Sequence, residues 1–211
     1  MEEFNKSPSN NEFFNKPEKL NLYDVLTNSY KPSESAFEKQ GYVYDKSLSN
    51  KNQQIYHNPT ENKLLISYTG TQNLSDWGTN LALATGHLKD TKRYKESKKA
   101  YDLAKQKYAG ADTTLAGHSL GSVLSSSVAN KGDKVYTLDR PTLPFQGIRS
   151  NETAYRSGGD PVSIFSIGSK RMKTLPSKVG NSLFYPSVVK SVKNALESHK
   201  VKQIKDKKIF I

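Results

Sequence analysis

The pentapeptide Gly117-His118-Ser119-Leu120-Gly121 has the residue types and the spacing of a turn that presents a nucleophile. A serine between two glycines is typical of a sharp connection from a strand to a helix, because a Cβ at either glycine would collide with the chain. Such a turn lifts the serine Oγ above the edge of the sheet. It also places the N–H of Leu120 at a helix N-terminus, where an oxyanion is favoured. The segment predicts Ser119 as a nucleophile.

A serine hydroxyl is a weak nucleophile at neutral pH and needs a base within hydrogen-bond reach. The chain has four histidines. His57 and His87 precede the serine, and His118 adjoins it and is expected to point elsewhere, packing or capping the turn. In the chain order serine, acid, histidine, His199 alone qualifies as the base. The alternative is that His199 is a solvated histidine in a lysine-rich segment.

Three aspartates lie between the serine and this histidine. Asp133 precedes a predicted strand and therefore falls at the wrong edge of the sheet. Asp139 follows the predicted strand VYTL, and Asp160 lies in a Gly-Gly-Asp-Pro loop that can reach the histidine. We favour Asp160 as the acid, with Asp139 as its rival. The acid would hold the tautomer of the base and stabilise the imidazolium.

The elements that must position these residues alternate between strand-like and helix-like segments. Predicted helices cover 20–30, 88–108, 119–130 and 187–198, and predicted strands cover 54–57, 64–68, 113–116, 135–138, 153–156 and 162–167. Right-handed crossovers between such strands give a mostly parallel sheet flanked by helices, which is an α/β fold. Residues 1–19 are mostly polar and are expected to form an arm, and residues 20–211 a single domain.

The composition excludes several kinds of chemistry. The chain has no cysteine, which rules out disulfides, thiolate metal sites and a cysteine nucleophile. Its N-terminus has no apolar stretch typical of a secretory signal, and no run approaches the roughly 18 apolar residues of a spanning helix. We expect a soluble or at most peripheral protein, located in the cytoplasm or associated with a virion, that needs no metal and no cofactor.

The positive charge is concentrated toward the C-terminus. The chain has a net charge of +12, and residues 170–211 carry 11 Lys and Arg against Glu197 and Asp206, a net +9. This distribution indicates attraction to an anionic membrane surface. No nucleic-acid-binding motif accompanies the charge, so nucleic acid is the weaker partner. The alternative is a solvated, lysine-rich face.

Three blocks of the chain resemble the class 3 (fungal-type) triacylglycerol lipases, a family of the α/β-hydrolase superfamily. They are Ser67-Tyr68-Thr69-Gly70-Thr71 with Asp76-Trp77, the pentapeptide 117–121, and Tyr155-Arg156 with Asp160-Pro161-Val162. The resemblance covers about residues 55 to 199. It implies an α/β-hydrolase fold and hydrolysis of carboxylic esters of lipids through an acyl-enzyme on Ser119, with His199 as base and Asp160 as acid.

The resemblance also implies roles outside this triad. Thr71 and Leu120 would donate their N–H groups to the oxyanion, and Asn80 would steady the oxyanion residue. Residues 73–86 would form a lid whose apolar side chains contact substrate, unless they simply pack in the core; these side chains are Trp77, Leu81 and Leu83.

The chain also departs from the pattern of this family. Thr69 stands where the family usually has Arg, and Ser122 where it often has a second glycine. The spacings that separate the serine, the acid and the histidine are short, so acyl-binding loops are expected to be trimmed. Two other functions stay open: a phospholipase acting at anionic membranes, and a non-catalytic, particle-associated binding protein on a hydrolase scaffold.

Overall fold

The structure is a computed structural model that describes residues 19–71, 87–142, 147–158, 160, 171–176 and 199–211. Several sequence predictions therefore lie outside the described residues. They are the arm up to residue 18, the lid with Trp77, Leu81 and Leu83, the oxyanion-supporting Asn80, the strand 162–167 and the helix 187–198.

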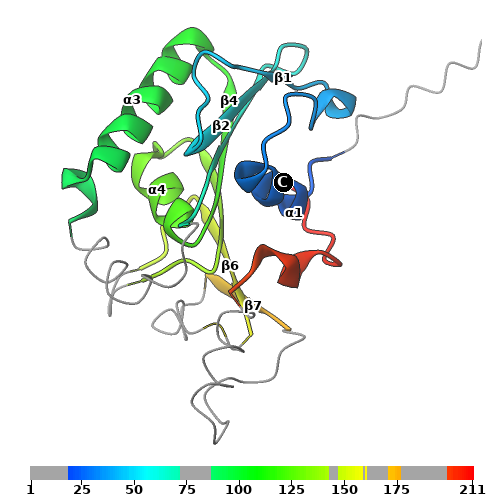
Figure 1. Cartoon of the computed structure of the whole chain (residues 1–211), viewed down its shortest axis with the longest axis vertical. Helices are drawn as coiled ribbons and strands as arrows, with labels where there is room; N and C mark the ends of the chain where they lie inside the picture. Colours follow the sequence, from blue (N-terminus) through cyan, green and yellow to red (C-terminus); the bar gives the residue numbers. More distant parts are fainter. Residues whose placement is uncertain (1–18, 72–86, 143–146, 159, 161–170, 177–198) are drawn as a thin grey trace, which may run out of the picture.

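One sheet of seven strands runs through the described part of the chain (Figure 1). Its strands, in spatial and chain order, are β1 (Val43–Tyr44), β2 (Gln53–Asn58), β3 (Lys63–Tyr68), β4 (Asp112–His118), β5 (Lys134–Leu138), β6 (Glu152–Ser157) and β7 (Met172–Leu175). Strands β1 to β3 pair antiparallel, and β3 to β7 pair parallel. The mostly parallel sheet is confirmed, and the strands predicted over 54–57 and 64–68 correspond to the antiparallel pair β2 and β3, whereas β1 and β7 were not predicted.

The helices are α1 (Leu22–Tyr30), α3 (Lys92–Lys107) and α4 (Leu120–Val128), with short 3-10 turns η1 (Glu38–Gln40), η3 (Leu88–Asp90) and η6 (Val201–Ile204). The helix predicted over 88–108 is divided into η3 and α3. The division falls at Thr91, whose side chain accepts the N–H of Tyr94 and so starts a new helix. In the described part of the chain, every helix is too short or too polar to cross a membrane.

The sheet has a hydrophobic core on each face, as the alternation of side chains along a strand requires. Leu64 and Ile66 of β3 pack with α3 and α4, whereas Leu65 packs with α1 and η6. Figure 1 shows α3 and α4 on one side of the sheet and α1 with the C-terminal segment on the other. The turn that contains Ser119 connects β4 to α4. The predicted site therefore lies at the carboxyl ends of the parallel strands.

The segment 199–211 runs beside α1 and pairs with the residues that precede it. The N–H of Ile211 donates to the carbonyl of Leu20 at 2.9 Å, and the N–H of Leu22 donates to the carbonyl of Ile209 at 2.8 Å. Since His199 begins this segment, the pairing fixes the segment that carries the predicted base against the N-terminal helix.

A buried ion pair braces the strands below the site. The carboxylate of Glu152, at the start of β6, accepts bonds from Arg140 at 2.9 and 3.2 Å, from Thr137 of β5 and from Ser126 of α4. Buried charges persist only when they are paired and hydrogen-bonded in this way. The cluster ties β5, β6 and α4 together and so holds the helix that follows the predicted nucleophile.

Candidate active site

Ser119 stands between the end of β4 and the start of α4 in a strained backbone conformation. Its φ is 57° and its ψ is −127°, and the residue is 2% exposed. A positive φ is uncommon for a residue with a Cβ and clusters at functional sites. The Oγ of Ser119 has no hydrogen-bond partner among the described residues.

The two flanking glycines fit the turn for the steric reason expected from the sequence. A Cβ on Gly117 would lie 2.2 Å from the carbonyl oxygen of Gly121, and a Cβ on Gly121 would lie 2.2 Å from that of Tyr68. Ser122, which departs from the family pattern, uses its N–H and its hydroxyl to bond to the carbonyl of Ser119. Ser122 therefore stabilises the turn at the position where class 3 lipases often have a glycine.

The predicted base and acid are hydrogen-bonded to each other. The Nδ1 of His199 lies 2.8 Å from the Oδ1 of Asp160, and the two side chains are 2% and 0% exposed. The N–H of Asp160 donates to the carbonyl of Ser157 at the end of β6. A carboxylate on Nδ1 keeps the proton on that nitrogen and leaves Nε2 able to accept one.

The rival acid, Asp139, also lies in this region, but its hydrogen bonds go elsewhere. Its Oδ1 accepts the N–H of Ser157 at 2.5 Å, and its Oδ2 lies 3.0 Å from the Ser157 hydroxyl. It follows β5 with a positive φ of 49°. Burial, and next the nearby charge of Asp160, raise the pKa of Asp139 well above its usual range. The structure thus pairs His199 with Asp160.

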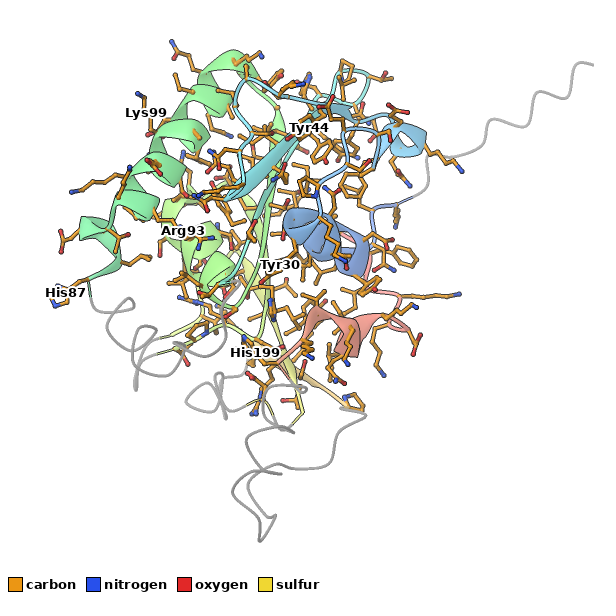
Figure 2. The ribbon with its side chains drawn as sticks, in the orientation of Figure 1. Tyr30, Tyr44, His87, Arg93, Lys99 and His199 are labelled. Carbon is orange, nitrogen blue, oxygen red and sulfur yellow. The ribbon has the colours of Figure 1, made fainter. Side chains whose placement is uncertain are left out.

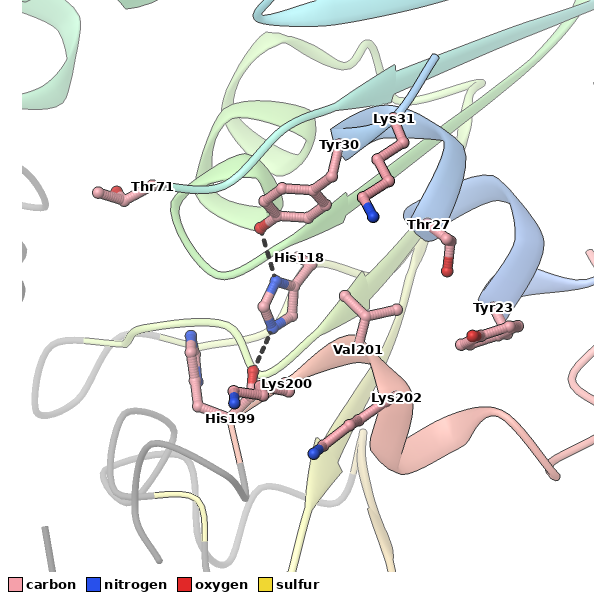
Figure 3. Close-up of a pocket in the computed structure, with 10 residues that line it drawn as sticks. All are labelled: Tyr23, Thr27, Tyr30, Lys31, Thr71, His118, His199, Lys200, Val201 and Lys202. Carbon is pink, nitrogen blue, oxygen red and sulfur yellow. Dashed lines mark hydrogen bonds between the residues drawn. The ribbon is translucent and has the colours of Figure 1, made fainter. Parts of the chain in front are cut away.

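His118 forms contacts that the sequence did not reveal. Its Nδ1 lies 2.8 Å from the Oη of Tyr30, and its Nε2 lies 2.6 Å from the backbone oxygen of His199 (Figure 3). Burial lowers the pKa of His118 to about 3, and the nearby His199 adds to the effect. Tyr30 lies 88 residues away in the chain, and no local pattern links it to the turn.

A pocket of about 360 Å³ opens beside these groups. Thr71, the predicted oxyanion residue, lines it and is half-buried, and Leu120 at the start of α4 is also half-buried. Figure 3 shows the lining residues, which come from α1 and the residue after it, the segment that follows β3, the end of β4 and the segment 199–202. Its described lining holds three lysines and no acidic residue; the lysines are Lys31, Lys200 and Lys202.

The side chains of His118, Asp139 and His199 could also be considered as metal ligands, because their ligand atoms lie within 4.8 Å of one another. However, both ring nitrogens of His118 and the Nδ1 of His199 already make hydrogen bonds. A metal ion would have to displace them, so the arrangement fits proton transfer better than metal binding.

The fold is that of a lipase-like α/β hydrolase. The Lip2 lipase of Yarrowia lipolytica matches with a TM-score of 0.50 and 12% identity, over 84% of this chain and 90% of that one. A Rhizomucor miehei lipase in a propeptide complex matches with a TM-score of 0.44 and 14% identity, over 67% of this chain. The chain spans 60% of that lipase. No curated protein matches the chain.

The family model of the Tle-like phospholipase domain matches residues 25–162, which is more than half of the chain. The chain therefore belongs to this phospholipase-like family. The class 3 lipase resemblance seen in the sequence is thus supported at the level of the lipase-like fold, whereas the family is the Tle-like one.

Proposed function

We propose that the protein is a serine hydrolase that cleaves carboxylic esters of lipids through an acyl-enzyme. One observation carries the proposal: a buried His199–Asp160 pair in the same region as a serine held at positive φ on a strand-to-helix turn. These are the parts that an activated serine requires. Membership of a phospholipase-like family supports the same reaction class.

In the proposed reaction the Oγ of Ser119 attacks the ester carbonyl carbon while the Nε2 of His199 takes its proton. The N–H groups of Thr71 and Leu120 hold the oxyanion of the tetrahedral intermediate. The intermediate then collapses: the bond to the alcohol oxygen breaks, and His199 returns the proton to that oxygen. Water repeats the sequence on the acyl-enzyme and releases the acid. Asp160 orients His199 and stabilises its imidazolium.

The burial of the site suits this chemistry. Ser119 and His199 are each 2% exposed, so charges that form on them interact at a lower effective dielectric than in water. The hydroxyl of Ser119 makes no hydrogen bond among the described residues. Bonds between nucleophile and base are often long in a free enzyme and shorten in the complex with substrate. We expect the bond from Ser119 to His199 to form in that complex.

We further propose that the ester substrate is a phospholipid. Lys31, Lys200 and Lys202 line the pocket that also holds His199, and the described lining has no acidic side chain. Ammonium groups at a cleft raise the local concentration of anionic groups such as a phosphodiester. The family to which the chain belongs is itself phospholipase-like.

Hydrolysis of short and long p-nitrophenyl esters tests the proposed reaction. Replacement of the nucleophile, Ser119→Ala, should lower turnover on the order of 10⁶-fold. The exposed Ser35→Ala is the matched control and should retain full activity. A fluorophosphonate probe should label the wild type and Ser35→Ala stoichiometrically and leave Ser119→Ala unlabelled. A folded wild type that is inert and unlabelled would instead indicate a binding protein on a hydrolase scaffold.

A further inference from the structure

Three hydrogen bonds connect two parts of the site that are distant in sequence. The N–H of Gly70, which directly precedes Thr71, donates to the Oη of Tyr30 at 3.0 Å. The Oη of Tyr30 lies 2.8 Å from the Nδ1 of His118, and the Nε2 of His118 lies 2.6 Å from the carbonyl oxygen of His199. This hydrogen-bond chain runs from Gly70 and Thr71, the oxyanion segment, through Tyr30 of α1 and His118 of the nucleophile turn to the backbone of His199, the proposed base.

The direction of each hydrogen in this chain follows from its ends. The carbonyl of His199 can only accept, so the Nε2 of His118 must carry a hydrogen. With a pKa of about 3, the ring of His118 is neutral at physiological pH, and its Nδ1 is therefore an acceptor. Burial raises the pKa of Tyr30 to about 12, so its hydroxyl keeps its proton and donates it to Nδ1. Every bond then points the same way, and such bonds reinforce one another.

The oxyanion segment lies very close to the tyrosine that holds it. A Cβ on Gly70 would lie 2.1 Å from the Oη of Tyr30 and 2.8 Å from the carbonyl oxygen of His118. The neighbouring residue makes a parallel contact, because the hydroxyl of Thr69 donates to the carbonyl of Ser29 at 2.7 Å. The end of α1 is thus attached to the end of β3 at two successive residues. The threonine that replaces the usual arginine of class 3 lipases makes one of these contacts.

We propose that Tyr30 and His118 are positioning residues that set the oxyanion segment and the base at the correct separation around Ser119. The inference rests on the proposed hydrolase function. Tyr30 engages the N–H of Gly70, which leaves the N–H groups of Thr71 and Leu120 as the donors for the oxyanion. His118 fixes the backbone of His199, while Asp160 fixes its ring. Tyr30 and His118 do not touch the reacting atoms in this scheme.

The substitution Tyr30→Phe tests the proposal, since it removes one oxygen and leaves the aromatic ring. The N–H of Gly70 and the Nδ1 of His118 lose their partner, and the oxyanion segment is released. A misplacement of about 1 Å at a catalytic group costs on the order of 10²-fold in rate. We expect kcat for p-nitrophenyl butyrate to fall about 10- to 100-fold per labelled site, with KM within about twofold of wild type.

Tyr44→Phe is the matched control, because it also removes one tyrosine hydrogen bond, to the Oε1 of Gln54 at 2.8 Å. Figure 2 shows Tyr44 well away from Tyr30 and His199. This variant should keep the wild-type kcat even if it is less stable. Fluorophosphonate titration counts the competent sites in each sample, so a loss of folded protein does not imitate a loss of kcat.

Two variants of His118 test the same positioning role if Tyr30→Phe folds poorly. His118→Gln retains an N–H donor toward the carbonyl of His199, and His118→Leu does not. The first should therefore keep at least about tenfold more activity per labelled site than the second. Equal activity of the two, or wild-type kcat in Tyr30→Phe, would overturn the positioning role while leaving the hydrolase function intact. A folded wild type that neither hydrolyses esters nor reacts with the probe would overturn both.

Discussion

The Nδ1 of His199 lies 2.8 Å from the Oδ1 of Asp160, although 39 positions of the chain separate the two residues. Asp160 is held just beyond the end of β6, and His199 begins the segment that runs beside α1. The carboxyl end of a parallel strand and a C-terminal segment thus meet at one buried point. Such meeting places at strand ends are where α/β folds bind ligands.

The two aspartates near this point should differ sharply in their effect on turnover. Asp160→Asn removes the acceptor on the Nδ1 of His199 and should lower kcat about 10⁴-fold. Asp139→Asn should cost less than about tenfold, since burial already disfavours the charge of Asp139 and an amide oxygen still accepts the N–H of Ser157. Steady-state hydrolysis of p-nitrophenyl butyrate measures both, with circular dichroism as the check on folding. A larger loss in Asp139→Asn would make Asp139 the acid.

The nucleophile turn should not accept a methyl group at either glycine. Gly117→Ala places a Cβ 2.2 Å from the carbonyl oxygen of Gly121, which must move, so we expect the free energy of unfolding to fall by about 1–3 kcal/mol. Esterase activity should fall as well, because Ser119 shifts with the turn. Gly132→Ala is the control: nothing lies within 4 Å of its added Cβ, and stability should change by less than about 0.5 kcal/mol. Urea unfolding compares them, and equal values would mean that the turn is adaptable.

The three pocket lysines should matter only for substrates that contain a phosphodiester. A triple variant with Lys31, Lys200 and Lys202 changed to Gln should lower kcat/KM on phosphatidylglycerol vesicles about 10- to 100-fold. Its hydrolysis of p-nitrophenyl butyrate should stay within about twofold of wild type, because this ester has no phosphate to bind.

A second triple variant controls for overall charge, with Lys89, Lys95 and Lys99 changed to Gln. It removes the same three charges from exposed positions, and Figure 2 shows Lys99 on the outer side of α3. The control should keep most of its activity on vesicles. An equal loss in both triple variants would indicate general attraction to the membrane in place of a site for the phosphodiester.

Stability in acid should depend on Asp45, far from the site. Burial alone would raise its pKa, but hydrogen bonds from Lys107, Ser47 and Tyr108 outweigh burial and lower the pKa of Asp45 to about 2, from 3.8. The stabilisation is therefore complete above about pH 4 and is lost as the pH falls toward 2.

Asp45→Asn should lower the free energy of unfolding at pH 7 by about 1 kcal/mol, allowing for the screening of Lys107 by solvent. The difference from wild type should shrink as the pH approaches 2. Urea unfolding at pH 7, 4 and 2.5 measures it, with the exposed Asp112→Asn as control. A difference that does not change with pH would contradict the assignment.

The parts of the fold that sequence patterns predicted well are those with strong local rules. The turn at Ser119 is bounded by glycines that sterics require, and the run TTLA before it lies within β4. Predicted helix ends were less accurate: the helix after the serine ends at Val128 in place of residue 130, and the segment 88–108 is interrupted by the cap at Thr91. The start of α3 is set by one side-chain hydrogen bond at Thr91, which periodicity does not report.

The contacts that sequence patterns did not predict join residues far apart in the chain. Tyr30 reads as part of an ordinary amphipathic helix, and nothing near it points to His118. The buried bonds of Asp139 to Ser157 likewise depend on the register of β5 and β6. The chain order serine, acid, histidine narrowed the candidates for the acid and the base. The choice between Asp139 and Asp160 as the acid depends on tertiary geometry, which the structure describes.

The pairing of Ile211 and Ile209 with the start of α1 has a consequence for the order of events in synthesis. His118 leaves the ribosome 81 positions ahead of His199, so the nucleophile turn exists before its base does. Under the proposed function, a nascent chain cannot attack lipids until the segment 199–211 docks beside α1. The docking of this short segment then completes the proposed site, and a block of this step would leave a folded sheet without catalytic activity.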